Sequence, residues 1–219
     1  MATNARQSEA DFLRTCDVAF QNVEENPVIK AALAEVGYDD AKIQEGKDLL
    51  STAQLKYDTN KKEENETSVA SLNFKTKKEE LRKLYSRHRK IAKVAFMDNP
   101  ATLILLDLEK PIPSTYTHWL EVLNVFYVEI LADQQLQDKL AQLKVTAEQL
   151  TQGAELIPEV KKLYATYKDE VGESENATKE KDTAFTALDL WMRTFYKIAA
   201  IVLEDEPQLL EALGKNVKS

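Results

Sequence analysis

Apolar residues recur along this chain at the three- and four-residue spacings of an α-helix. Between residues 119 and 130 they are spaced 4, 3 and 4 and share one helical face: Trp119, Leu123, Phe126 and Ile130. This stripe changes phase near Asp133. A matching stripe near the start of the chain breaks at Asn26 and Pro27, which suit a helix cap and a first helical turn. We therefore predict a bent or broken helix in both places.

The chain repeats its pattern at an offset of 107 residues. "KIAKVAFMDNPATLILL" begins at Lys90, and "KIAAIVLEDEPQLLEAL" begins at Lys197. At this offset 21 of 112 aligned pairs are identical, which is well above the chance level. A repeat this long predicts a duplicated structural unit. We expect two helical repeats, residues 1–107 and 108–219, joined where the prolines of "LEKPIPSTYTHW" stop a helix.

Capping residues predict the later helices of each repeat. Asp39 and Thr146 suit the start of a second helix, which we expect to end near Asn65 and Val171. The polar stretches "EENETSV" and "GESENAT" then predict a turn that leads into a third helix. In "DNP" and "DEP" the aspartates, Asp98 and Asp205, suit the cap of a short fourth helix whose first turn holds the proline.

Two glycines, Gly46 and Gly153, occupy matched positions early in the second helix of each repeat. Glycine inside a helix costs about 1 kcal/mol relative to alanine. Either nothing selects against these glycines, or each admits a close neighbour, for which the first helix of the repeat near Leu33 or Leu140 is the natural candidate.

Taken together, these patterns predict an all-α fold. No stretch alternates as a strand does, and only 5 glycines and 6 prolines occur in 219 residues. We predict an antiparallel helical bundle of two tandem pseudo-symmetric helical repeats. Each repeat would run up, down and up, and the two would pack together as one bundle about a pseudo-twofold axis.

Composition restricts the expected cellular location and the expected binding partners. A net charge of −8 and a pI of about 5.0 oppose sequence-independent binding to nucleic acid. No apolar run reaches membrane-spanning length, and "MATNARQSEADFLRT" lacks the basic-then-apolar order of a signal peptide. A cytoplasmic location is therefore the expectation.

Positive charge is concentrated on the third helix of the first repeat. At about 100° per residue, six cations fall on one side, opposite the apolar stripe: Arg82, Lys83, Arg87, Arg89, Lys90 and Lys93. The aligned residues of the second repeat are mostly uncharged. Two interpretations stay open, a solvated face or a surface for an acidic partner, either another protein or a second copy of this chain.

Candidate catalytic and metal-binding residues are few. The chain has two histidines, His88 and His118, and neither follows a glutamate by three residues as in carboxylate-bridged metal bundles. Cys16 aligns with an apolar residue, which predicts a small buried side chain. His88 aligns with Phe195, which favours a core histidine with one hydrogen bond, although a ligand contact or pH-sensitive joint is the alternative. No phosphate loop or nucleophile elbow occurs, so we expect no metal and no cofactor, and the sequence favours a protein that is not an enzyme without deciding the question.

Three segments, "GYDDAKIQEGKDLL", "VTAEQLTQGAELI" and "WMRTFYKIAAIVLEDEPQLLEALG", resemble uncharacterised bacterial helical-bundle proteins of unknown function. This resemblance implies an all-helical bundle and transfers neither an activity nor functional residues. The first hypothesis is a non-enzymatic interaction or scaffold protein. The alternatives are a small-molecule-binding bundle with a pocket near His88, Trp119, Trp191 and Phe195, and an enzyme of unrecognised type.

Overall fold

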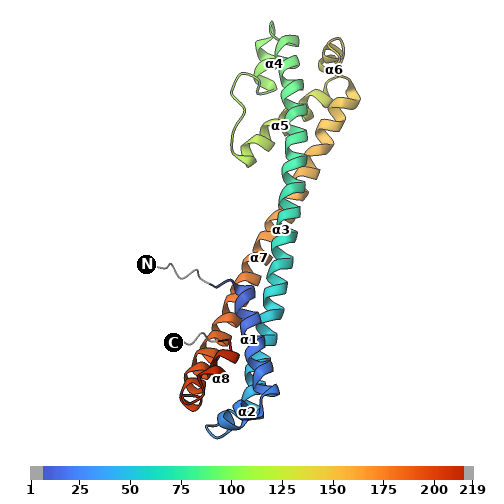
Figure 1. The fold of residues 1–219 in the computed structure, drawn as a ribbon. Helices are drawn as coiled ribbons and strands as arrows, with labels where there is room; N and C mark the ends of the chain where they lie inside the picture. Colours follow the sequence, from blue (N-terminus) through green and yellow to red (C-terminus); the bar gives the residue numbers. More distant parts are fainter. Residues whose placement is uncertain (1–6, 215–219) are drawn as a thin grey trace. The chain divides into compact units, whose positions relative to one another are not determined.

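The protein is built from helices alone over residues 7–214, the part that the computed structural model describes. The helices in chain order are α1 (Glu9–Glu25), α2 (Pro27–Ala34), α3 (Asp40–Ala95), α4 (Pro100–Leu105), α5 (Tyr116–Ala132), α6 (Gln134–Ala141), α7 (Ala147–Val202) and α8 (Pro207–Ala212) (Figure 1). The predicted all-α class is confirmed. Each bound of α5–α8 equals the corresponding bound of α1–α4 plus 107. The duplication itself stays a prediction.

The two predicted helix breaks are confirmed, and side-chain caps explain both. Asn26 Oδ1 accepts hydrogen bonds from the backbone N–H groups at the start of α2, and Asp133 Oδ1 does the same for α6. These caps satisfy donors that a new helix leaves without intrahelical partners. Gly37 ends α2 with φ +88°, a conformation that glycine adopts without steric cost.

The cap residues before the two short helices differ from the prediction. Asn99, and not Asp98, accepts a hydrogen bond from Thr102 N at the start of α4. At α8 the residue in the cap position is Glu206, and its side chain makes no capping bond. Because proline occupies the first helical position, the cap is the residue directly before it, and the aspartates stand one place too early.

The predicted turns at "EENETSV" and "GESENAT" are wrong. Helices α3 and α7 run without interruption through these stretches, and each contains 56 residues. Neither stretch contains proline, both contain glutamates, which are good helix formers, and most of their residues are exposed, which accounts for their polarity. The predicted up-down-up arrangement within each repeat is therefore wrong as well.

The chain divides into two compact units that do not coincide with the two repeats. Unit 1 comprises residues 1–64 and 173–219, and unit 2 comprises residues 65–172. Unit 1 thus combines α1, α2 and the first part of α3 with the last part of α7 and α8. Unit 2 combines the last part of α3 and α4 with α5, α6 and the first part of α7. Each unit takes one part from each repeat.

Within each unit α3 and α7 lie antiparallel. In unit 1, Lys56 Nζ lies 2.6 Å from Glu180 and Asn60 Nδ2 donates to Thr178. In unit 2, Thr67 Oγ1 donates to the backbone oxygen of Glu170, and Lys77 pairs with Glu159 at 3.4 Å. In both units the partner number falls as the α3 number rises, so the predicted antiparallel packing is confirmed. Each unit has its own apolar core.

Gly46 and Gly153 mark close approaches to the core aromatics. A Cβ at Gly46 would lie 2.6 Å from Trp191 Cη2 and 2.7 Å from Phe20 Cζ, and one at Gly153 would overlap the ring of Tyr127. Phe20 and Tyr127 belong to α1 and α5, so the first helix is the neighbour, as predicted. The contact residues are these aromatics, and not those near Leu33 or Leu140.

Candidate functional site

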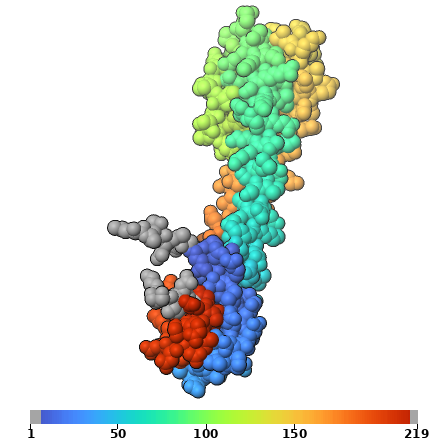
Figure 2. All heavy atoms as spheres, viewed as in Figure 1, coloured from blue at the N-terminus to red at the C-terminus, as the bar shows by residue number. Residues whose placement is uncertain are grey.

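The six predicted cations of α3 fall in unit 2. Five are exposed, namely Arg82, Lys83, Arg87, Lys90 and Lys93, whereas Arg89 is half-buried. Figure 2 shows the green segment of α3 that carries them at the molecular surface. Four of these cations line a shallow hollow of about 500 Å³ together with Ser86 and Ile91. We call the five exposed cations the basic face.

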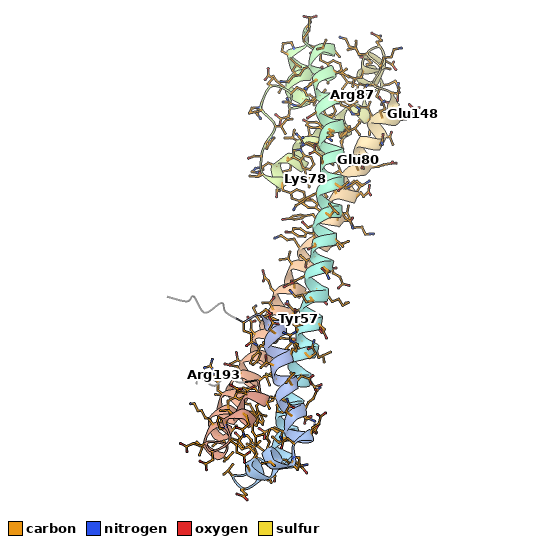
Figure 3. All side chains as sticks on the ribbon, in the orientation of Figure 1. Tyr57, Lys78, Glu80, Arg87, Glu148 and Arg193 are labelled. Atoms are coloured by element: carbon orange, nitrogen blue, oxygen red, sulfur yellow. The ribbon has the colours of Figure 1, made fainter. Side chains whose placement is uncertain are left out.

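Ion pairs occupy only one end of the basic face. Arg82 forms a bidentate salt bridge with Glu79, in which Nε donates to Oε2 at 2.6 Å and Nη2 donates to Oε1 at 2.7 Å. These hydrogen bonds raise the pKa of Arg82. Lys83 lies 3.9 Å from the same carboxylate. Among the described residues Arg87, Lys90 and Lys93 have no ion pair, and Figure 3 shows Arg87 extending from α3. Three neighbouring cations are thus available to a partner.

Arg89 belongs to the fold and not to the basic face. Its Nη2 donates to the backbone oxygens of Leu108 at 3.0 Å and of Lys110. These bonds hold the segment that follows α4 against α3. The helical periodicity placed Arg89 at the edge of the cationic side, and the chain that packs there decides its role.

Net charge divides unequally between the compact units. Unit 1 contains 14 Lys+Arg and 22 Asp+Glu, a net charge of −8, whereas unit 2 contains 15 of each and is neutral overall. At the positions of Arg87, Lys90 and Lys93, unit 1 has Thr194, Lys197 and Ala200. The acidic excess that opposed sequence-independent binding to nucleic acid therefore lies in unit 1, and the basic face lies in unit 2.

His88 is a core residue, as the more conservative interpretation predicted. It is 1% exposed, and its Nδ1 lies 3.2 Å from Tyr127 Oη. Burial, and secondarily the Arg87 guanidinium, lowers the pKa of His88 to about 4. The matching residues in unit 1 are Phe195 and Phe20, whose rings lie 6.3 Å apart. A polar pair in one unit thus replaces an aromatic pair in the other.

The four residues of the suggested small-molecule pocket do not share one site. His88 and Trp119 belong to unit 2, whereas Trp191 and Phe195 belong to unit 1. Trp191 stacks on Phe195 at 5.4 Å and fills the core of its own unit. The small-molecule hypothesis therefore loses the residues on which it rested.

Both units have an open groove between their first helix and the long helix that follows it. In unit 1 a groove of about 740 Å³ lies between α1 and α3, with Leu13 and Tyr57 among its walls. In unit 2 a groove of about 450 Å³ lies between α5 and α7, with the matching Leu120 and Tyr164. The recurrence indicates a packing feature of the fold.

The sequence analysis missed a lysine held by aromatic rings. Lys78 Nζ lies 5.6–5.7 Å from the ring centroids of Phe74, Tyr116 and Trp119, and Figure 3 labels Lys78 on α3. At the matching positions of unit 1 the lysine and phenylalanine are exchanged, as Lys181 and Phe185. There Lys181 pairs with Glu9 at 2.7 Å. The exchange of lysine and phenylalanine between the two repeats is the sequence feature that could have pointed to a lysine beside an aromatic ring.

Cys16 is buried at 1% exposure, as predicted. Burial, followed by the negative charge of Asp189, raises the pKa of its thiol to about 12. The thiol is therefore protonated at neutral pH and is a poor nucleophile.

No protein-family model, curated protein or solved structure matches the chain. None of the helices between residues 7 and 214 combines the length and the hydropathy that a membrane crossing needs.

Proposed function

We propose that this chain is a non-enzymatic interaction protein that binds an anionic partner through the basic face of α3. The observation that supports this proposal is the run of three exposed cations, Arg87, Lys90 and Lys93, which have no ion pair within residues 7–214. They lie in a compact unit of zero net charge, so no acidic excess in that unit opposes an anionic partner. We also propose that the protein is cytoplasmic and that it is related to uncharacterised bacterial helical-bundle proteins.

A labelled poly-glutamate peptide tests this function by fluorescence anisotropy at low ionic strength. The intact chain should bind the peptide, and binding should weaken as salt is added because salt screens exposed charges. The double variant Arg87→Glu/Lys90→Glu should bind at least about tenfold more weakly, since both attractive contacts become repulsive.

The repeat provides a matched control variant. Thr194→Glu/Lys197→Glu alters the equivalent helix positions in unit 1, where Lys197 is retained but Thr194 and Ala200 replace the cations that align with them. This control should bind the peptide within about twofold of the parent. Equal affinities of the parent and the Arg87→Glu/Lys90→Glu variant would show that the basic face is only solvated.

A further inference from the structure

We infer that the anionic partner of the basic face is a phospholipid bilayer with acidic headgroups. This inference rests on the proposed function and names the class of partner. Acidic lipid surfaces attract clusters of four to eight Lys and Arg residues, and the basic face contributes five. The hollow between Arg82, Lys83, Arg87 and Lys90 is lined by cationic groups that suit phosphate oxygens.

Exposed apolar side chains continue the basic face at its C-terminal end. Val94 is 62% exposed and Met97 is 65% exposed. At about 100° per residue, Met97 falls between Lys93 and Lys90, and Val94 falls between Lys90 and Arg87. After a short turn, α4 exposes Ile104 at 65% and lies next to the end of α3 (Figure 1). Cations and the exposed apolar groups Val94 and Met97 thus share one side of the last part of α3.

A bilayer offers the chemistry that matches both parts of this surface. Its headgroup layer provides phosphates for the cations, and the acyl boundary directly beneath takes up apolar side chains. Nucleic acid presents phosphates but leaves Val94 and Met97 without an apolar contact. No acidic residue occurs between Arg82 and Met97, so no carboxylate on this stretch would face the headgroups.

The matching surface of unit 1 lacks this combination. The segment that aligns with residues 82–97 begins at Asp189 and ends at Glu204. Ile201, which aligns with Val94, is also exposed at 68%, yet Ala200 stands where Lys93 would be. In unit 1 the exposed Ile201 therefore has one aligned cation beside it, Lys197, whereas unit 2 combines its exposed apolar groups with five exposed cations.

Vesicle co-sedimentation with the full chain tests the inference. The probes are vesicles of phosphatidylglycerol and phosphatidylcholine in equal parts, and vesicles of phosphatidylcholine alone. The parent should bind the first and not the second. Arg87→Glu/Lys90→Glu should reduce binding at least roughly 30-fold, because each lost cation contributes on the order of a fivefold increase in affinity and each new carboxylate is repelled by the acidic headgroups. Thr194→Glu/Lys197→Glu should bind as the parent does.

A second variant separates a bilayer from an acidic protein. Val94→Ser/Met97→Gln keeps every charge and removes the apolar groups, so vesicle binding should fall about tenfold. Binding to poly-glutamate should stay unchanged in this variant. Circular dichroism and melting temperature confirm that each variant folds as the parent does.

The outcomes keep the two proposals apart. If the parent binds poly-glutamate but not the acidic vesicles, the bilayer inference is wrong and an acidic protein takes its place. The same holds if Val94→Ser/Met97→Gln binds vesicles as well as the parent does. If the parent binds neither probe, the proposed function fails together with the inference.

Discussion

At the level of single residues, the two compact units fill equivalent core positions with different pairs of side chains. Unit 1 places Phe20 and Phe195 in contact, and unit 2 places Tyr127 and His88 there. In both units a glycine of the long helix lies against the ring that the first helix provides: Gly46 against Phe20, and Gly153 against Tyr127. A buried polar pair is acceptable only while both partners are bonded, because an unpaired buried group costs roughly 1–3 kcal/mol.

Stability should therefore depend on pH through His88. The folded chain keeps this imidazole neutral down to about pH 4, whereas the unfolded chain protonates it below about pH 6.5. The unfolded state binds more protons between these values, so stability is full above pH 6.5 and falls as the pH drops toward 4. The expected loss is up to about 1.4 kcal/mol per pH unit.

Urea unfolding at pH 7 and pH 5 measures this dependence. His88→Phe/Tyr127→Phe, which copies the pair of unit 1, should lose the His88 contribution to the pH slope. His88→Phe alone should be less stable than the double variant, because it leaves the Tyr127 hydroxyl without its partner. An unchanged slope in the double variant would show that His88 does not titrate as its burial requires.

The glycines give a second residue-level prediction. Gly153→Ala should destabilise the fold by about 1–3 kcal/mol, because its Cβ would overlap the Tyr127 ring. Gly172 lies in the same helix, and a Cβ added there would meet no neighbouring group within 4 Å, so Gly172→Ala should stabilise by roughly 0.5–1 kcal/mol. Thermal melting compares the two. Equal shifts in both variants would contradict the steric account.

At the level of elements, α7 keeps its helix through an internal proline. Pro158 lies on the exposed side of α7, and Ser51 holds the matching position in α3. Proline inside a helix removes one backbone hydrogen bond and costs about 3 kcal/mol. The helix continues because apolar contacts on its other side, including Leu156 and Ile157, hold it in the core of unit 2.

Replacing this proline should stabilise the protein. Pro158→Ala restores the missing donor, and we expect a gain of about 1–3 kcal/mol in the free energy of unfolding. Ser51→Pro places the same defect in α3 and should cost about 3 kcal/mol. Chemical denaturation measures both. A loss of stability in Pro158→Ala would show that packing requires a bend at this residue.

At the level of the whole molecule, each compact unit needs parts of both repeats. Phe20 of the first repeat packs on Trp191 of the second at 5.4 Å, and Tyr127 of the second repeat bonds His88 of the first. Residues 1–107 and 108–219, produced separately, should each lack a complete core and melt well below the intact chain. Mixed in equal amounts, they should form a one-to-one complex with most of the parent stability.

Size-exclusion chromatography with light scattering and circular dichroism measures this complementation. A fragment of residues 1–107 that is monomeric and melts like the parent would contradict the division into units. It would instead support the closed up-down-up repeat that the sequence predicted.

Local chemistry in the sequence determined the helices, the caps at Asn26 and Thr146, and the exposed cations of α3, because these depend on neighbours three or four residues apart. It also placed Cys16 and His88 in the core through their alignment with apolar residues.

Only the tertiary structure decided that α3 and α7 continue through their polar middles. A polar stretch without proline is compatible with both a turn and an exposed helix, and the choice depends on which distant segment completes the core. The same reason explains why the sequence predicted neither the bonds that Arg89 makes to the segment after α4 nor the contact of Lys78 with three aromatic rings. Their partners are distant in the sequence, on segments that only the fold brings together.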